Sequence, residues 1–200
     1  MTSWEISQPI KILIAFTFLS LAFVIGPNTI LETDNTIEEP KIAKVVDPKQ
    51  LSCLAKNIFY EAGSEPLSGQ AAVARVVMNR IAYGFGKNPC AVVYQANTVD
   101  RLVNDEIQKV KQCQFSWVCE GKDDPNKNNP KYKQAERVAY DVLAYDEYKD
   151  VIPRTALFFH NLNVDPLWPY KQVAKIGNHI FYSKSKKNTQ KTVTTAENNI

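Results

Sequence analysis

Histidine is scarce in this sequence, and the cysteine spacing typical of metal sites is missing. Only two histidines occur among the 200 residues, and no C-x-x-C pair exists among the four cysteines, Cys53, Cys90, Cys113 and Cys119. Structural zinc sites are usually built from several cysteines and histidines at such short spacings. The sequence therefore predicts no metal site, and no motif in it indicates a cofactor.

A basic surface is also missing from most of the chain. The formal net charge is +3, but residues 184–200 hold four lysines against one glutamate, which accounts for the whole excess. A nucleic-acid-binding face needs basic residues clustered in the folded domain. We therefore expect no nucleic-acid partner, and the chain shows no internal repeat.

One apolar run stands out near the N-terminus, at residues 12–26, directly after Lys11. At fifteen residues it is shorter than the ~20 of a membrane-spanning helix and closer to a signal-peptide core. Pro27 and Asn28 follow it instead of a small-x-small cleavage site. We expect an uncleaved signal anchor with a cytoplasmic N-terminus, and hence a membrane contact through residues 12–26. A cleaved signal peptide and a buried core helix are the alternatives.

The rest of the chain divides by composition. We expect a polar tether at residues 27–46, one folded domain at residues 47–184 and a disordered basic tail at residues 185–200. This arrangement places the domain outside the cytoplasm. Four cysteines in an exported domain allow up to two disulfides in three connectivities, and free buried thiols are the alternative.

The domain begins with a pattern typical of two helices joined by a short turn. Asp47 can cap the first helix, and the turn at residues 63–66 ends it because Pro66 disfavours helical geometry in the residue before it. Ser68 can cap the second helix, which we expect to run to about Ala82.

Later segments add shorter helices and strands. Residues 97–112 are polar with scattered apolar side chains, so we expect a helix or an ordered loop. Gly177 and Asn178 suit a two-residue hairpin turn between strands at residues 173–176 and 179–182. Further expected elements are a short helix at 88–94, a helix that starts at Asn129-Pro130 and a strand at 156–160. The fold class is therefore α+β, mainly helical, with a short β-hairpin sheet.

Glu61 is the candidate acid of this domain. It lies in the last turn of the first expected helix, about 80° around the axis from Leu51, on the margin of the apolar face. Partial burial there favours the neutral carboxyl and raises its pKa, as a general acid requires. A solvent-exposed residue near a helix end is the alternative interpretation.

Three motifs resemble those of the SleB/CwlJ-type cell wall hydrolases, which include spore-cortex-lytic enzymes. They are CLAKNIFYEAGSEPLSGQAAVARVVMNR from residue 53, CQFSW at 113–117 and IGNHIFY at 176–182, in the family's order. The resemblance implies a small lysozyme-like, lytic-transglycosylase-like fold, peptidoglycan glycan strands as partner and Glu61 as the catalytic residue. Gly63-Ser64 departs from the Arg-Gly of many members, so a cation beside the acid is missing at that point.

Glycoside cleavage needs a proton donor and stabilisation of an oxocarbenium-like centre. Glu65 is the nearest second carboxylate in sequence, and its direction cannot be predicted across the turn; the N-acetyl group of muramic acid can stabilise the centre instead. We therefore predict a lytic transglycosylase that cuts between N-acetylmuramic acid and N-acetylglucosamine. A muramidase, an amidase of the peptide stem and a non-catalytic peptidoglycan-binding module remain open.

Polar and aromatic residues of the three motifs are candidates for the glycan groove. Amide, hydroxyl and imidazole groups can bind sugar hydroxyls and N-acetyl groups, and flat aromatic rings can stack on sugars, although core packing is the alternative for each ring and a structural role for each histidine. The candidates are Tyr60, Gln70, Gln114, Phe115, Ser116, Trp117, His160, Asn178, His179 and Tyr182.

Overall fold

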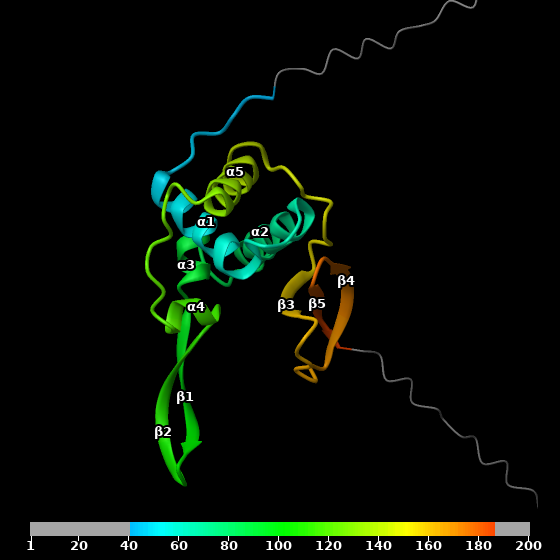
Figure 1. Ribbon diagram of the computed structural model, residues 1–200. Coiled ribbons are helices and arrows are strands. Elements are labelled where there is room, and N and C mark those ends of the chain that lie inside the picture. The colour runs from blue at the N-terminus through cyan, green and yellow to red at the C-terminus, as the bar shows by residue number, and fades with distance from the viewer. Residues whose placement is uncertain (1–40, 187–200) are drawn as a thin grey trace, which may run out of the picture. The chain divides into compact units, whose positions relative to one another are not determined.

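The computed structural model describes residues 41–186, which contain five helices and five strands (Figure 1). The predicted signal anchor at 12–26, most of the tether and the residues of the tail after 186 lie outside the described residues. Within residues 41–186, no helix is both long enough and apolar enough to cross a membrane.

Three longer helices build the main core. They are α1 (Pro48–Ala62), α2 (Leu67–Ala82) and α5 (Pro130–Tyr145), and α1 packs against both of the others (Figure 1). Leu54 and Ile58 of α1 are fully buried among small α2 side chains and the apolar face of α5. The core therefore forms where the helical spacing of apolar residues predicted it.

Two of the three predicted helix N-caps agree with the structure, and one does not. Asp47 accepts a hydrogen bond from the Lys49 amide and Asn129 accepts one from the Lys131 amide, so both predicted caps are confirmed. The predicted Ser68 cap is wrong, because α2 already begins at Leu67 and has no side-chain cap. The Pro66 carbonyl accepts from the amides of Gly69 and Gln70 and so starts the helix earlier.

The short helix α3 (Pro89–Val93) is also confirmed, with Asn88 as its cap. The disulfide Cys53–Cys90 joins it to α1, and a second disulfide joins Cys113 to Cys119 of the short helix α4 (Ser116–Cys119). All four cysteines are paired, so the structure selects one of the three possible connectivities and excludes free thiols.

A three-stranded antiparallel sheet lies beside α2. Its order is β3-β5-β4, with β3 at Ala156–Asn161, β4 at Tyr170–Ile176 and β5 at His179–Lys186 (Figure 1). The predicted turn is confirmed, because Gly177 joins β4 to β5 with a positive φ of 56°. Phe181 of β5 is fully buried against Ala72 and Val76 of α2, which makes a second small core.

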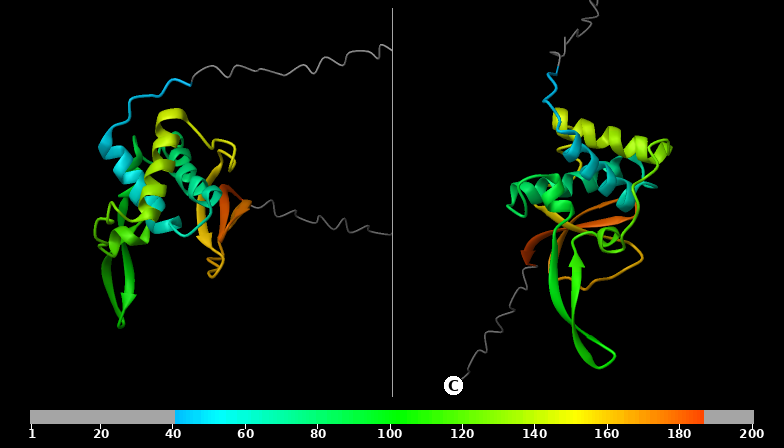
Figure 2. Two further views of the ribbon diagram at one scale, coloured as in Figure 1. Left: turned by 45° about the horizontal axis from the view of Figure 1, so that its top comes forward. Right: turned by 90° about the vertical axis from the view of Figure 1, so that its left-hand side faces the viewer.

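The segment at 97–112 is the main correction to the sequence analysis. It is neither a helix nor a loop but an antiparallel hairpin, β1 (Ala96–Val103) and β2 (Glu106–Cys113), which projects away from the helices (Figures 1 and 2). Asn104 and Asp105 make the turn with φ of 49° and 63°, values that these residue types tolerate. Most of its side chains are exposed, so no buried face left an alternating apolar pattern in the sequence.

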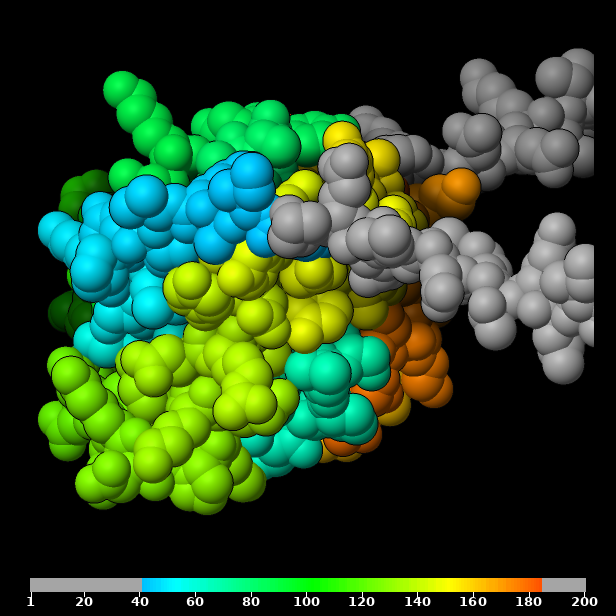
Figure 3. All heavy atoms as spheres, turned by 90° about the horizontal axis from the view of Figure 1, so that it is seen from above, coloured from blue at the N-terminus to red at the C-terminus, as the bar shows by residue number. Residues whose placement is uncertain are grey.

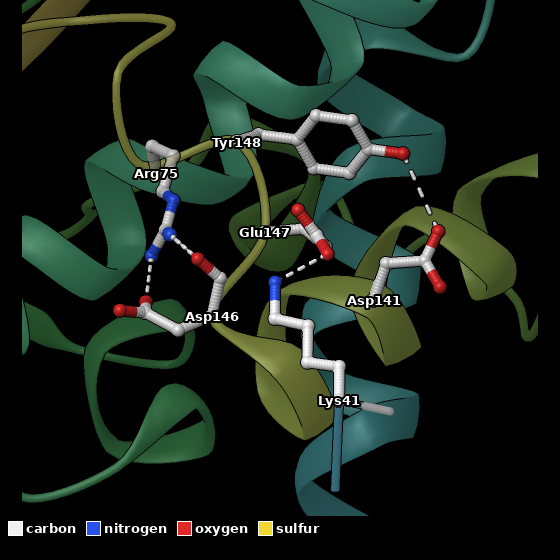
Figure 4. Close-up of polar contacts among 6 residues, drawn as sticks. All are labelled: Lys41, Arg75, Asp141, Asp146, Glu147 and Tyr148. Atoms are coloured by element: carbon white, nitrogen blue, oxygen red, sulfur yellow. Dashed lines mark hydrogen bonds and ion pairs between the residues drawn. The ribbon is translucent and has the colours of Figure 1, made fainter. Parts of the chain in front are cut away.

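Ion pairs hold the C-terminal end of α5 against α2 and against the segment before α1. Arg75 of α2 is buried and donates to the carboxylate and the carbonyl of Asp146, at 2.7 and 2.6 Å, where α5 ends (Figure 4). Lys41 pairs with Glu147 nearby, and the Lys44 amide donates to the Ala144 carbonyl. Residues 41–47 are thereby held along α5, on the helical face that Figure 3 shows.

Candidate active site

Glu61 lies between two hollows of the surface. The first hollow has a volume of about 490 Å³ and lies toward the β1–β2 hairpin and strand β3; the second has about 590 Å³ and lies over the α1–α2 turn and the start of α5. Glu61 lines both of them. A polymer that occupied both hollows would therefore pass beside Glu61.

The carboxyl of Glu61 is tuned as an acid. Burial raises its pKa from 4.5 to about 7, while the positive charge of Arg80 lowers it and the negative charge of Glu120 raises it. The expected margin position, partial burial and raised pKa of Glu61 are confirmed. A carboxyl with a pKa near neutrality can give up a proton and take one back, which allows one residue to act as acid and then as base.

Arg80 places a positive charge near Glu61, although Gly63-Ser64 lacks the arginine that many family members carry there. It comes from the end of α2, is 4% exposed and donates from Nε to the Leu157 carbonyl at 2.7 Å. Its guanidinium lies 5.0 Å from the Phe115 ring centre and 5.7 Å from that of Phe158. Burial lowers the pKa of Arg80 to about 10, which leaves it charged beside Glu61. Sequence reasoning missed it, because only its place in the Asn-Arg motif marked it.

Glu65 does not act as a free second carboxylate. Its two oxygens accept from the backbone amide and the side-chain amide of Asn178, each at 3.0 Å. Burial raises its pKa, but these hydrogen bonds and the nearby His179 outweigh burial and hold the pKa below its usual range. Glu65 is therefore an ionised clamp between the α1–α2 turn and the β4–β5 turn, and Asn178 is its partner.

Some predicted sugar-binding residues lie inside the protein. Trp117 is 5% exposed, donates from Nε1 to Asn57 Oδ1 at 3.1 Å and lines neither hollow. Gln70 is buried and donates to the Glu65 carbonyl, so that it supports the turn. Trp117 therefore packs in the core, which is the alternative given for each aromatic ring. Gln70 stabilises the α1–α2 turn.

Other predicted residues line the hollows. Gln114, Phe115 and Ser116 line the first hollow, although Phe115 is itself only 3% exposed. Tyr60 lines the second hollow, stacks on Trp117 and donates from its hydroxyl to the Asp123 carbonyl.

The two histidines line different hollows. His160 lines the first hollow; its Nδ1 lies 2.8 Å from the Asn161 carbonyl and its Nε2 lies 2.9 Å from the hydroxyl of Tyr182. Because the carbonyl can only accept, Nδ1 carries the proton in the neutral ring and Nε2 accepts from Tyr182. His179 lines the second hollow, and burial lowers its pKa. Tyr182 thus orients His160 and lines neither of these two hollows.

An aromatic wall that the sequence analysis missed completes the first hollow. Phe158 stacks on Tyr170 with ring centres 4.5 Å apart, and Trp168 lies 5.6 Å from the His160 ring. Trp168 and Tyr170 are half-buried, which suits flat contacts with sugar rings. Their spacing in LWPY was the available signal, but nothing before the fold linked it to Glu61. Among residues 41–186, no group of three or more His, Cys, Asp or Glu could hold a metal ion.

The chain is similar to known proteins in sequence and in structure. The sequence model of the family described as Cell Wall Hydrolase matches residues 64–182, a range that begins just after Glu61. The catalytic domain of the germination-specific lytic transglycosylase SleB from Bacillus anthracis has 22% identity and a TM-score of 0.50 over 70% of this chain and 98% of that one. The catalytic domain of the Bacillus cereus SleB protein has 20% identity and a TM-score of 0.47 over 72% and 96%. A search of curated proteins gave no match.

The first of these structures shares the fold, which confirms the α+β, lysozyme-like architecture. The family match covers more than half of the chain. It contains CQFSW and IGNHIFY in full, together with residues 64–80 of the first motif. A cleft built around a protonatable carboxyl agrees with a degradative enzyme of peptidoglycan. The chain belongs to the cell wall hydrolase family.

Proposed function

We propose that this cell wall hydrolase is a lytic transglycosylase that cleaves the bond between N-acetylmuramic acid and N-acetylglucosamine, with Glu61 as its single acid and base. One observation carries the proposal: Glu61 is the carboxyl shared by both hollows, and its pKa is about 7. Two disulfides within residues 41–186 suit an oxidising compartment, so we place its action in the periplasm or cell wall space.

The first step is proton donation. A protonated Glu61 gives its proton to the glycosidic oxygen, the bond to the muramic acid C1 breaks, and positive charge develops on that sugar. The carboxylate that remains lies beside Arg80, whose charge stabilises it. In the second step the sugar's own O6 attacks C1, and Glu61 takes the proton from O6. The product end is a 1,6-anhydro sugar, and Glu61 is protonated again.

A second catalytic carboxylate has no candidate in the lining of the two hollows. Glu65 is the other acidic residue there, and Asn178 occupies both of its oxygens. Stabilisation by the N-acetyl group of the substrate fits this arrangement better than a protein nucleophile does. The aromatic wall of Trp168 and Tyr170, with Gln114 and Ser116, supplies sugar contacts in the first hollow.

Glu61→Gln tests the role of the acid. The amide keeps the shape but cannot donate this proton, so we expect release of glycan fragments from sacculi to fall at least about 100-fold. Binding to sacculi should persist. Undiminished release would exclude Glu61 as the acid, and a wild type that sediments with sacculi but releases nothing would favour a binding module.

The same variant gives a control that does not depend on activity. The folded pKa of Glu61 lies above its unfolded value, so its stabilising contribution is full below about pH 4.5 and is lost as the pH rises through about 7. Glu61→Gln should therefore gain stability relative to wild type between pH 5 and pH 8, by up to about 3 kcal/mol. Denaturant unfolding at pH 5 and at pH 8 measures the difference in unfolding free energy between the variant and wild type. A difference that is the same at both pH values would show that the carboxyl is not buried.

A further inference from the structure

We propose that one face of the β1–β2 hairpin is a binding surface for the part of the glycan strand that extends beyond the first hollow. The inference rests on the proposed function, since it concerns the same substrate. The surface consists of three cross-strand pairs, which we call the groove face: Asn97 with Gln112, Val99 with Val110, and Arg101 with Gln108.

Strand geometry places these pairs together. Each pair is directly opposite in the antiparallel register, and alternate residues of a strand point to the same side. Asn97 and Gln112, the pair at the foot of the hairpin, line the first hollow together with Glu61. The groove face therefore continues from the lining of that hollow out along the hairpin, which projects from the body of the protein (Figure 1).

The chemistry of the groove face fits a polysaccharide. Amide groups at the foot and on Gln108 offer both donors and acceptors for hydroxyl and N-acetyl groups. Val99 and Val110 are half-buried and form an apolar step between the polar pairs, suited to the apolar side of a sugar ring. Arg101 faces Gln108, and within the described residues no ion pair involves it, so its charge is available to the carboxylates that peptidoglycan carries.

The opposite face of the same hairpin is different. There Asp100 pairs with Lys109 at 3.2 Å, and Thr98 lies opposite Lys111. Leu102 and Ile107 form an exposed apolar pair near the tip. At the foot of this face only Cys113, opposite Ala96, lines the first hollow, whereas both residues of the Asn97–Gln112 pair on the groove face line it. The two faces therefore give matched variants on one element.

The hairpin also has no core to explain its shape. A two-stranded ribbon is marginally stable on its own, and this one is secured mainly at its foot, by the Cys113–Cys119 disulfide and by the Gln114 amide that donates to the Gln95 carbonyl. These contacts fix the end that carries Asn97 and Gln112 at the hollow. The remainder projects as an accessible arm that a bound strand can contact along its length.

The test compares long and short substrates. Arg101→Ser combined with Gln108→Ser alters the groove face away from the hollow; Asp100→Ser combined with Lys109→Ser is the control on the opposite face. The substrates are intact sacculi and a purified peptidoglycan tetrasaccharide. A strand rises about 3.3 Å per residue, so Arg101 lies about 13 Å farther along the hairpin than Asn97, and a short substrate held at Glu61 should depend less on it. We expect the groove-face variant to raise KM for sacculi about fivefold and to cleave the tetrasaccharide within about twofold of wild type.

The control should stay within about twofold of wild type on both substrates. An unchanged KM of the groove-face variant for sacculi, or an equal loss on both substrates, would overturn the inference. So would a loss on sacculi that appears only in a Leu102→Ser, Ile107→Ser variant, because that would place the contact on the opposite face. Failure of the wild type to cleave either substrate would instead overturn the proposed function.

Discussion

Two hairpins flank the candidate active site, and they are built in opposite ways. The β4–β5 hairpin belongs to a three-stranded sheet and buries Phe181 completely against α2. The β1–β2 hairpin pairs only with itself and exposes most of its side chains. The first is fixed by packing, whereas the second is fixed at its foot. A hairpin packed against α2 and a hairpin that projects into solvent thus lie on either side of the hollows around Glu61.

The turns of the two hairpins show the same contrast. Gly177 of the β4–β5 turn approaches Glu65 so closely that a Cβ on it would lie 2.0 Å from Oε2. The β1–β2 turn uses Asn104 and Asp105 at positive φ and lies in solvent. One turn is part of the clamp beside the active site, and the other only reverses the chain. Substitutions should therefore be costly in the first hairpin and mild in the second.

The largest difference is expected in the strands. Phe181→Ala removes a fully buried ring and should cost about 3 to 5 kcal/mol of unfolding free energy, whereas Ile107→Ala, in a side chain that is 77% exposed, should change it by less than about 0.5 kcal/mol. Urea denaturation of both variants measures the difference between the two losses of unfolding free energy. Similar losses would mean that the β1–β2 hairpin has a core that we have not recognised.

A smaller difference is expected in the turns. Gly177→Ala forces a Cβ into Glu65 at a positive φ and should cost about 2 kcal/mol or more, together with activity, because the clamp beside Glu61 opens. Asp105→Gly, at φ 63°, should stay within about 0.5 kcal/mol of wild type and keep full activity on the short substrate. Thermal unfolding and tetrasaccharide cleavage check both; a harmless Gly177→Ala would show that the turn is not held against Glu65.

The smallest expected effect is a change in the pH dependence of activity on substitution of Arg80, a residue that contacts both hairpin regions. Its guanidinium lies over Phe115, just after the first hairpin, and over Phe158 of the three-stranded sheet. Its charge lowers the pKa of Glu61, so Arg80→Gln should raise that pKa and keep Glu61 protonated at higher pH. The ratio of activity at pH 8 to activity at pH 6 should then increase about threefold.

Arg80→Lys is the matched control, because it keeps the positive charge; its ratio should stay closer to that of wild type. Unfolding curves at both pH values separate this effect from a loss of folded protein. A ratio that falls in Arg80→Gln would contradict the assignment of Glu61 as the group that must be protonated.

Most of the helical fold could be predicted, and the reason is local. Asp47 and Asn129 cap helices through contacts two residues away, and Leu54 and Ile58 repeat at helical spacing, so the information lies within one or two turns. Ser68 misled the prediction because a backbone carbonyl, that of Pro66, took over the start of α2. The β1–β2 hairpin was missed because a solvated ribbon leaves no alternating apolar pattern, and only its Asn-Asp pair marked the turn.

The candidate active site likewise contains residues that local sequence predicts and residues that only the fold brings together. The raised pKa of Glu61 follows from its position on the margin of a helix face, and the sequence shows that position. Arg80, Trp168 and Tyr170 reach the first hollow from distant parts of the chain, so no spacing in the sequence connects them with Glu61. Glu65 is the nearest second carboxylate in sequence, but Asn178 of the β4–β5 turn, more than a hundred residues later, binds both of its oxygens, and no local pattern shows that contact.

The most direct test of the account is the mass of the fragments that the wild-type enzyme releases from purified peptidoglycan. Cleavage through Glu61 alone, with O6 of the sugar as the attacking group, predicts disaccharide-peptides with a 1,6-anhydromuramic end, one water lighter than a reducing end, and none from Glu61→Gln. Reducing muramic ends would show that water attacks instead. Free stem peptides with intact glycan strands would contradict glycosidic cleavage altogether.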